Sequence, residues 1–220
     1  MPWPGHGDGM ERYHDRAEAG RELSRLLGHH RGSRPLVLGL AGGGMVVAAE
    51  VAAALEGSLD VVVAVPFGPP GDPGLCVGAA ASDGTAVVEG DLAARLGLGA
   101  ADLTPVMAEA AAQAAARRRA FGRGGAVPVA GRTVIVVDDG VAGGAVLRAA
   151  LGLVRRCGPA FLSCAVPVGL PASVDLIAAE VDEIVCPLQP LRFRSVEEWY
   201  DEFPGVGDAE VAALLSTHPG

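Results

Sequence analysis

The sequence predicts an α/β protein with a mostly parallel, twisted sheet, helices on both faces and a small hood. Half of the 220 residues are hydrophobic but only 4% are aromatic, so the core must consist of Val, Leu, Ala and Ile. Such a core favours buried parallel strands with alanine-rich helices. Short apolar runs alternate with segments of helical periodicity, which is typical of βαβ units. No repeat or low-complexity linker divides residues 1–220, so we expect one domain.

The first elements follow this alternation. Residues 12–28 place apolar side chains at helical spacing with charges between them, which predicts a helix. The run PLVLGL at 35–40 predicts a strand, which leads through a glycine turn into a helix over 45–57 that ends at Gly57. The run LDVVVAV at 59–65 predicts the next strand.

An excursion from the sheet is expected after residue 65. Prolines exclude regular structure there, at positions Pro66, Pro69, Pro70 and Pro73. Residues 74–88 predict a hairpin that turns at Asp83 and Gly84. We expect residues 66–90, together with residues 189–207, to form the hood.

The second half of the chain returns to alternating helices and strands. A helix within 91–121 is expected to start near Asp102 or Thr104, with Pro105 in its first turn. The remaining predicted elements are a strand at 133–138, a helix at 143–158, a strand at 160–169, a helix at 171–181, a strand at 182–188 and a helix at 208–215.

Charge and composition exclude several classes of function. The net charge of −9 argues against binding to nucleic acid or to an anionic membrane. No run of about 18 apolar residues is present, and the polar start lacks a signal-peptide pattern, so we expect a cytoplasmic protein. The cysteines form no CxxC pair and are expected to be reduced core residues, at positions Cys76, Cys157, Cys164 and Cys186.

The basic residues narrow the choice further, because all 17 are arginine. The absence of lysine excludes a Walker-type phosphate loop and a Schiff-base enzyme. It also excludes the usual sites of response regulators and haloacid dehalogenases, which combine acids at a strand end with a lysine.

Two glycine-rich turns follow predicted strands, LGLAGGGM at 38–45 and VDDGVAGGAV at 137–146. Ligands of an open parallel sheet bind outside the carboxyl ends of the strands. Each turn leads into a helix N-terminus, where unpaired N–H groups and the helix dipole attract anions. The first turn approximates a dinucleotide-binding GxGxxG motif, but that fold needs an acid at the end of the next strand. Here Asp60 precedes the strand, which disfavours a dinucleotide site.

The second turn places two acids at the end of an apolar strand. Asp138 and Asp139 are expected to face ligand and solvent and to accept hydrogen bonds from vicinal hydroxyls. The N–H groups of residues 141–146 would bind a phosphate about one sugar length away. The alternative is structural: Asp139 and Gly140 form only a turn, and Asp138 caps the following helix.

At this stretch the chain resembles the type I phosphoribosyltransferases, which hold the ribose 5-phosphate of phosphoribosyl pyrophosphate (PRPP) with the same strand, acid pair and phosphate loop. The similarity to one bacterial branch of the family extends to residues 35–65, to PPGDPGLCVGAAASDGTAV and to FRSVEEWYDEFPGVGDAEVAALL. It implies a type I phosphoribosyltransferase-like fold, a phosphorylated sugar or nucleotide as ligand, and a homodimer.

The resemblance also implies roles for individual residues. The acid pair would bind the ribose 2- and 3-hydroxyls, residues 142–146 would surround the 5-phosphate, and residues 41–44 would lie near pyrophosphate. In an active enzyme Mg²⁺ would bridge the pyrophosphate. Ala142 stands where hypoxanthine–guanine enzymes often carry a base-contacting Asp, which disfavours that specificity. The implied binding residues are Asp138, Asp139, Gly140, Val141, Ala142, Gly143, Gly144, Ala145, Val146, Ala41, Gly42 and Gly43.

The chain departs from the family pattern on the phosphate and pyrophosphate side. Gly143 and Val146 replace the usual hydroxyl side chains, and three positions that are usually cationic carry Gly42, Val65 and Pro66. Charge-assisted hydrogen bonds to phosphate contribute about 1.5–3 kcal/mol each. We therefore expect the sugar half of the site to be kept and the leaving-group half to be weakened.

Two classes of function stay open. One is transfer from PRPP, or from a related donor, to an unknown acceptor. The other is a catalytically degenerate relative that binds a sugar phosphate, a nucleotide or a protein partner. No catalytic residue and no protein metal ligand is assigned.

Further arginine, aromatic and histidine residues are candidates for the site. A group of arginines could replace the missing cations but is expected to form a solvated helix end: Arg117, Arg118, Arg119 and Arg123. The tail aromatics are expected to pack the hood rather than stack on a base: Trp199, Tyr200 and Phe203. Four histidines show no ligand spacing and are assigned no role: His6, His29, His30 and His218.

Overall fold

The computed structural model describes residues 12–72, 74–122 and 127–217. A parallel five-stranded sheet in the order β2-β1-β6-β7-β8 forms its centre. The strands are β1 (Leu36–Leu40), β2 (Ser58–Val62), β6 (Thr133–Val137), β7 (Phe161–Ala165) and β8 (Glu183–Val185). β1, β6, β7 and β8 lie within runs from which strands were predicted, whereas β2 begins one residue before the run predicted at 59–65 and ends at Val62. The α/β class with a mostly parallel sheet is confirmed.

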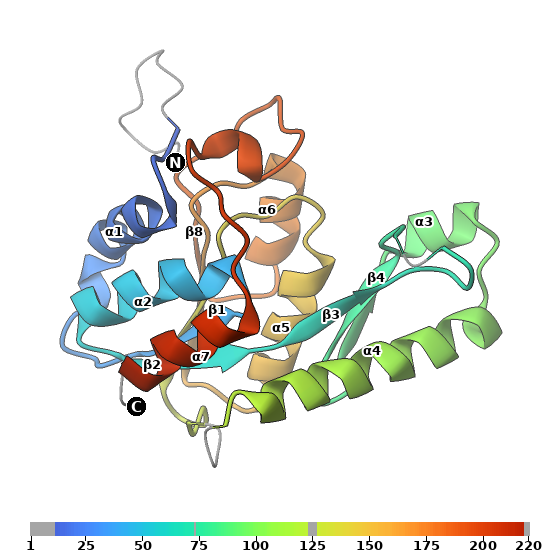
Figure 1. Ribbon diagram of the computed structural model, residues 1–220, viewed down its shortest axis with the longest axis horizontal. Coiled ribbons are helices and arrows are strands. Elements are labelled where there is room, and N and C mark those ends of the chain that lie inside the picture. The colour runs from blue at the N-terminus through green and yellow to red at the C-terminus, as the bar shows by residue number, and fades with distance from the viewer. Residues whose placement is uncertain (1–11, 73, 123–126, 218–220) are drawn as a thin grey trace.

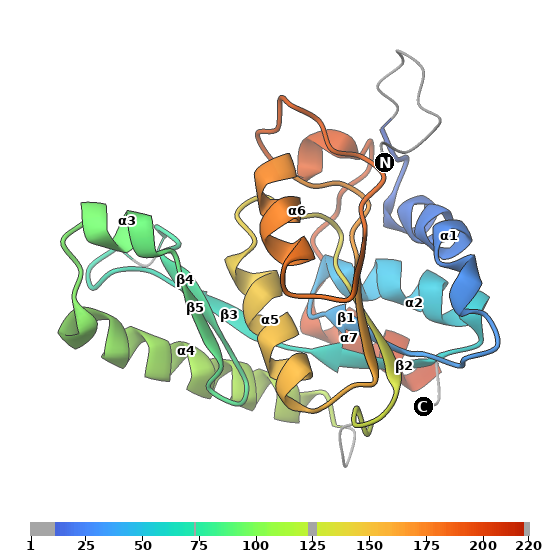
Figure 2. The same cartoon turned by 180° about the vertical axis from the view of Figure 1, so that it is seen from behind.

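Helices cover both faces of this sheet. Figure 1 shows α1 (Arg16–Leu26), α2 (Gly43–Leu55) and α7 (Asp208–Thr217) on one face. Figure 2, seen from behind, shows α5 (Ala145–Arg156) and α6 (Pro171–Ala178) on the other. Within the part of the chain that the structure describes, every helix is too short or too polar to cross a membrane.

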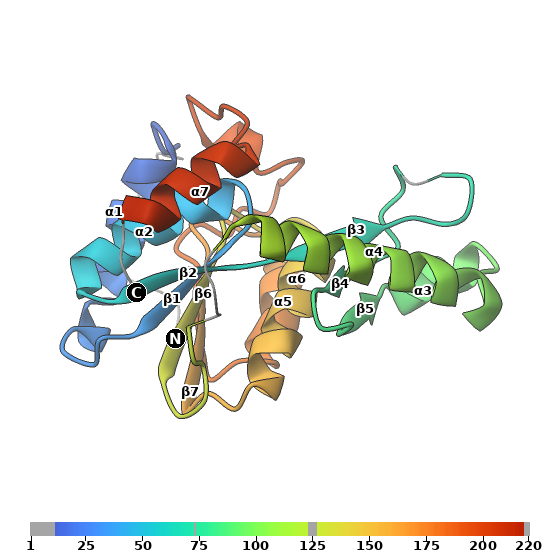
Figure 3. The ribbon, with the colours of Figure 1, turned by 60° about the horizontal axis from the view of Figure 1, so that its bottom comes forward.

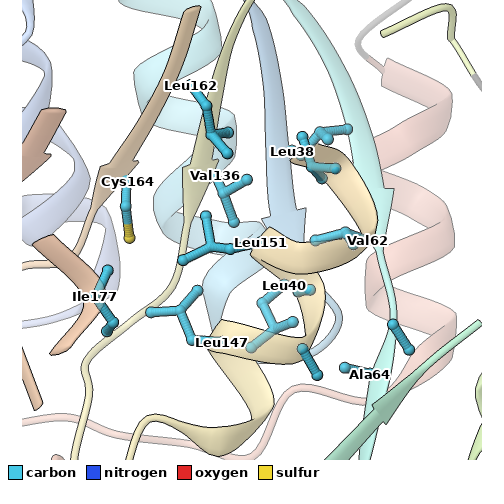
Figure 4. Packing of buried hydrophobic residues seen from close by; sticks show 14 of the residues in the cluster. Leu38, Leu40, Val62, Ala64, Val136, Leu147, Leu151, Leu162, Cys164 and Ile177 are labelled. Carbon is cyan, nitrogen blue, oxygen red and sulfur yellow. The ribbon is translucent and has the colours of Figure 1, made fainter. Parts of the chain in front are cut away.

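The side chains of each strand belong alternately to two apolar clusters, because successive side chains of a strand point to opposite faces of the sheet. Leu36 and Leu38 of β1 pack toward α5, whereas Val37 packs toward α2. Figure 4 shows Leu147 and Leu151 of α5 among the side chains of β1, β2 and β6. Burial of each such leucine contributes about 1.5–3 kcal/mol. This packing fixes the N-terminus of α5 against the carboxyl end of β6.

A second, antiparallel sheet projects from the first as an arm (Figure 3). Its strands are β3 (Ala64–Phe67), β4 (Gly78–Ala81) and β5 (Ala86–Val88). The predicted hairpin is confirmed: Gly84 has φ +87°, and Asp83 accepts a hydrogen bond of 2.8 Å from the N–H of Thr85. The prediction of no regular structure at Pro66 is wrong. Pro66 lies in β3, an edge strand, where a missing N–H is tolerated.

The predicted helix within 91–121 is interrupted. Residues 90–95 form α3 (Gly90–Arg95), and α4 (Ala100–Ala120) then runs along the arm. The start predicted near Asp102 is close to the observed one, because α4 begins at Ala100 and Asp102 lies in its first turn. Its side chain accepts a hydrogen bond of 2.9 Å from the N–H of Gly99, which caps α4.

The two segments predicted to form the hood belong to different parts of the molecule. Residues 66–72 and 74–90 lie in the arm, whereas residues 189–207 include η2 (Glu197–Trp199) and lie beside the start of the described chain. The N–H of Tyr13 donates to the carbonyl of Trp199 over 2.9 Å. Both segments reach the same cavity, which is described next.

Candidate functional site

A cavity of about 700 Å³ lies where β6 ends and α5 begins. One wall is the turn between these elements, and another is the arm. Eight of the predicted binding residues line it: Asp138, Gly140, Val141, Ala142, Gly143, Gly144, Ala145 and Val146. The cavity therefore lies at the carboxyl ends of the strands, where ligands of a parallel sheet are expected to bind.

The turn over residues 140–146 exposes the N-terminus of α5 to this cavity. Gly144 caps the helix in the left-handed region, with φ +86°. The first N–H groups of a helix have no partner within the helix, and the dipole makes this end positive. The hydroxyl of Ser173 holds the turn in place by donating to the carbonyl of Ala142. These features suit the binding of an anion such as phosphate.

Asp138 is half-buried at the wall of the cavity. Its Oδ1 atom accepts a hydrogen bond of 2.9 Å from the N–H of Asp139. Burial, reinforced by the neighbouring Asp139 carboxylate, raises the pKa of Asp138 well above its ordinary range. A carboxyl group in this position can accept hydrogen bonds from sugar hydroxyls, and it takes up a proton more readily than an exposed aspartate.

Asp139 lies beside the cavity but does not line it. Its Oδ2 atom is 2.7 Å from Nε of Arg16, and the two side chains are only 15% and 8% exposed. Arg16 in turn donates to the carbonyl of Pro204 over 2.6 Å and lies 3.6 Å above the ring of Phe203. The hydroxyl of Tyr200 donates to the carbonyl of Asp139 over 2.6 Å. The expectation that Asp139 faces ligand and solvent is therefore wrong, because its carboxylate is mostly buried and pairs with Arg16. Its contact with a ribose hydroxyl stays a prediction.

The first glycine turn approaches the acid pair instead of the cavity. Ala41, Gly42 and Gly43 are not among the residues that line the cavity, so their predicted contact with pyrophosphate stays a prediction. A Cβ atom added at Gly43 would collide with the carboxylate of Asp139 and the guanidinium of Arg16. Gly43 therefore allows the Arg16–Asp139 pair to lie against the N-terminus of α2, the positive end of the helix dipole, which favours the Asp139 carboxylate.

We expect Gly43→Ala to destabilise the fold by about 1–3 kcal/mol, because the added methyl group must displace the Arg16–Asp139 pair. Gly90→Ala is the matched control, since a Cβ at Gly90 meets no atom within 4 Å. Urea unfolding measures both variants. An unchanged midpoint for Gly43→Ala would contradict the close approach.

The arm supplies cavity residues that were not predicted: Cys76, Glu89, Asp91, Leu92 and Arg95. Among the described residues, Glu89 stands out because its Oε1 atom is buried without a hydrogen-bond partner. The charged groups that line the cavity are thus three carboxylates and one guanidinium. No sequence signal pointed to these residues, because only the placement of the arm brings them to the turn.

Other residues weighed as site components have structural roles. Arg117 pairs with Asp208 at 2.6 Å, and Arg118 pairs with the buried Asp60 at 3.0 Å. The Arg117 pair fits the expected solvated helix end, but that expectation is wrong for Arg118, whose side chain is only 17% exposed. Arg123 lies outside the described residues. The packing role of the tail aromatics is confirmed, with Trp199 and Tyr200 each 4% exposed.

The cysteine prediction holds only in part. All four cysteines are free thiols, as predicted, and Cys164 is buried in the core. The prediction of core positions is wrong for Cys76 and Cys157, which are exposed, and Cys76 lines the cavity.

Comparisons with known proteins identify relatives of the whole chain. A family model described as phosphoribosyl transferase domain matches residues 9–198. A Mycobacterium tuberculosis protein, provisionally named a phosphoribosyl transferase, is 37% identical over 207 residues, which cover 94% of this chain and 47% of that protein. The chain thus spans about half the length of the curated relatives it matches.

A solved structure is similar over the entire fold. The crystal structure of the protein TT1426 from Thermus thermophilus is 36% identical and has a TM-score of 0.79. The alignment covers 95% of this chain and 100% of that chain.

Proposed function

Because this chain belongs to the phosphoribosyl transferase family, we propose that its cavity binds a ribose 5-phosphate-type ligand. One observation carries the proposal: the amide-rich turn at the N-terminus of α5 and the carboxyl group of Asp138 share one cavity. The turn would hold the phosphate, and Asp138 would accept hydrogen bonds from the ribose hydroxyls. The volume of about 700 Å³ is sufficient for a sugar phosphate or a nucleotide.

The charge of the cavity favours binding of the sugar phosphate over binding of pyrophosphate. Asp138, Glu89 and Asp91 line it, with Arg95 as the cation among the lining residues. A pyrophosphate group would meet more negative than positive side chains there, which costs free energy. We therefore propose a ligand that carries one phosphate, held by backbone N–H groups.

Transfer from PRPP to an unknown acceptor is the second candidate. The unpartnered Oε1 atom of Glu89 favours it, because Glu89 and Asp138 offer hard oxygen ligands in one cavity. Such oxygens fit Mg²⁺, which would neutralise the charge of a pyrophosphate donor when bound. Asp138 would then orient the ribose. The homodimer and the cytoplasmic location expected from the sequence stay predictions.

A substitution series at Gly143 tests the proposal by calorimetry with ribose 5-phosphate. Gly143 is exposed, and a Cβ there meets nothing within 4 Å, so the fold should tolerate each change. Gly143→Ser adds a hydroxyl donor and should strengthen binding by up to about tenfold. Gly143→Asp places a charge against the phosphate and should abolish binding. Gly143→Ala is the control and should leave the affinity unchanged.

Titration with PRPP and with pyrophosphate, each with Mg²⁺, separates the two candidates. Binding of ribose 5-phosphate but not of pyrophosphate supports the sugar-phosphate site. Binding of both supports transfer. The proposal fails if ribose 5-phosphate produces no heat at millimolar concentration, or if Gly143→Asp binds it as well as the unaltered chain.

A further inference from the structure

A cluster of two histidines and one glutamate lies far from the cavity. Glu183 is the first residue of β8. It therefore lies at the amino end of the parallel strands, whereas the cavity lies at their carboxyl ends. His29 and His30 belong to η1 (Gly28–His30), the short helix that follows α1. Sequence spacing assigned these histidines no role, because Glu183 is 153 residues beyond His30 in the chain.

The three side chains converge on one point. Nε2 of His29 is 2.7 Å from Oε1 of Glu183, and Nε2 of His30 is 2.7 Å from Oε2. One ligand atom from each residue lies within 4.8 Å of the others. The imidazole rings of the two histidines are 4.1 Å apart between centroids. Each residue therefore offers a metal-binding atom to the same small volume.

Neighbouring groups hold this arrangement in place. The hydroxyl of Ser163, in β7, donates to Oε2 of Glu183 over 2.7 Å. The side chain of His30 is only 10% exposed, and its ring lies 5.7 Å from the ring of Phe161. His29 is different, because its side chain is 54% exposed. The cluster thus combines two positioned ligands with one that solvent can reach.

We propose that His29, His30 and Glu183 form a binding site for a divalent transition-metal ion such as Zn²⁺. Two imidazoles and a carboxylate are ligands that zinc accepts readily, whereas Mg²⁺ and Ca²⁺ prefer sites built from oxygen alone. A tetrahedral zinc ion would separate adjacent ligand atoms by about 3.3 Å. The pairs now at 2.7 Å need to open only slightly, and the exposed His29 can accommodate this.

The ion would connect η1 to the edge strand β8. Apart from the ion, two hydrogen bonds to Glu183 make this connection. The fourth coordination position would face solvent on the side of His29 and take a water molecule. This geometry assigns the ion a structural role, independent of the cavity and of the ligand proposed for it.

Zinc titration of the intact, tag-free chain tests the proposal. After treatment with a chelator, calorimetry should show one Zn²⁺ per chain, and the bound ion should raise the melting temperature. His29→Ala should weaken binding more than about 100-fold, and Ser163→Ala, which removes the donor to Glu183, about 10- to 100-fold. His14→Ala is the matched control, because His14 is an exposed histidine outside the cluster.

Cobalt spectroscopy checks the identity of the ligands. Co²⁺ bound to the cluster should lack thiolate-to-cobalt charge-transfer absorption, whereas binding at the exposed Cys76 or Cys157 would produce it. The proposal is overturned by thiolate absorption, by the absence of zinc binding, or by equal affinity of His29→Ala and His14→Ala. The proposal is supported if His29→Ala loses the zinc-dependent rise in melting temperature and His14→Ala keeps it.

Discussion

Replacement of Arg16 with alanine should destabilise the protein by about 3–5 kcal/mol, the usual result of removing one partner of a buried ion pair. The Arg16 and Asp139 side chains are 8% and 15% exposed, and Nε lies 2.7 Å from Oδ2. Without the guanidinium, the Asp139 carboxylate is left next to Asp138 with its nearest cation removed. Arg16→Ala also removes the contacts that hold Phe203 and Pro204 against α1.

Urea unfolding at neutral pH measures this effect, and Arg25→Ala is the matched control. Arg25 belongs to the same helix and pairs with Glu22 at 2.6 Å, but the two side chains are 73% and 33% exposed. An exposed pair contributes at most about 1 kcal/mol. The double variant Arg16→Met with Asp139→Asn removes both charges and should recover much of the loss. Equal destabilisation by Arg16→Ala and Arg25→Ala would show that the pair is not effectively buried.

The Arg16 contact also bears on function. Arg16 pairs with the Asp139 carboxylate, for which the family resemblance implies a hydrogen bond with a ribose hydroxyl. Arg16 also connects α1 to the carbonyl of Pro204. Two aromatic residues adjoin this contact: the ring of Phe203 lies under the Arg16 guanidinium, and Tyr200, 5.0 Å from Phe203 between ring centroids, donates to the carbonyl of Asp139. The acid pair is thus divided: Asp138 lines the cavity, and Asp139 is held by the scaffold.

The regular elements of the central sheet could be predicted because their signals are local. The strand at 133–137 is an unbroken apolar run, and the helix that follows repeats its apolar residues with helical period. The turn between them needs glycine at Gly144, and the sequence contains it. The prediction that Pro66 lies outside regular structure was wrong, because a strand tolerates proline when it lies at the edge of a sheet. Local sequence does not reveal which strands lie at an edge.

The candidate site could be predicted only where it is built from one continuous segment. Residues 138–146 supply all of the predicted binding residues that line the cavity, and they are continuous in the chain except for Asp139. Contacts between distant segments had no signal. Arg16 lies 123 residues before Asp139, and Glu89 reaches the cavity through the placement of the arm. The two histidines adjoin Glu183 for the same reason.

Asp138→Asn should weaken binding of ribose 5-phosphate by roughly tenfold to a hundredfold, because the amide offers the sugar hydroxyls one acceptor oxygen where the carboxyl group offers two. The same change should stabilise the protein without ligand at neutral pH. Burial and the adjacent Asp139 raise the pKa of Asp138 in the folded state above its ordinary value of 3.8. Between these two pKa values the folded state holds a proton that the unfolded state has lost, so stability decreases as the pH rises. Asparagine carries no such cost.

Urea unfolding with and without Asp138→Asn, at neutral pH and at a lower pH below the ordinary pKa of aspartate, tests the sign. The stabilisation should be present at neutral pH and should vanish near the lower pH, where Asp138 is protonated in both states. Asp182→Asn is a control of opposite sign, because the hydrogen bond from Arg155 lowers the pKa of Asp182. If Asp138→Asn instead destabilises the protein at neutral pH, the carboxylate serves the fold and not the cavity. If it raises stability but leaves ligand affinity unchanged, the ribose contact must lie elsewhere.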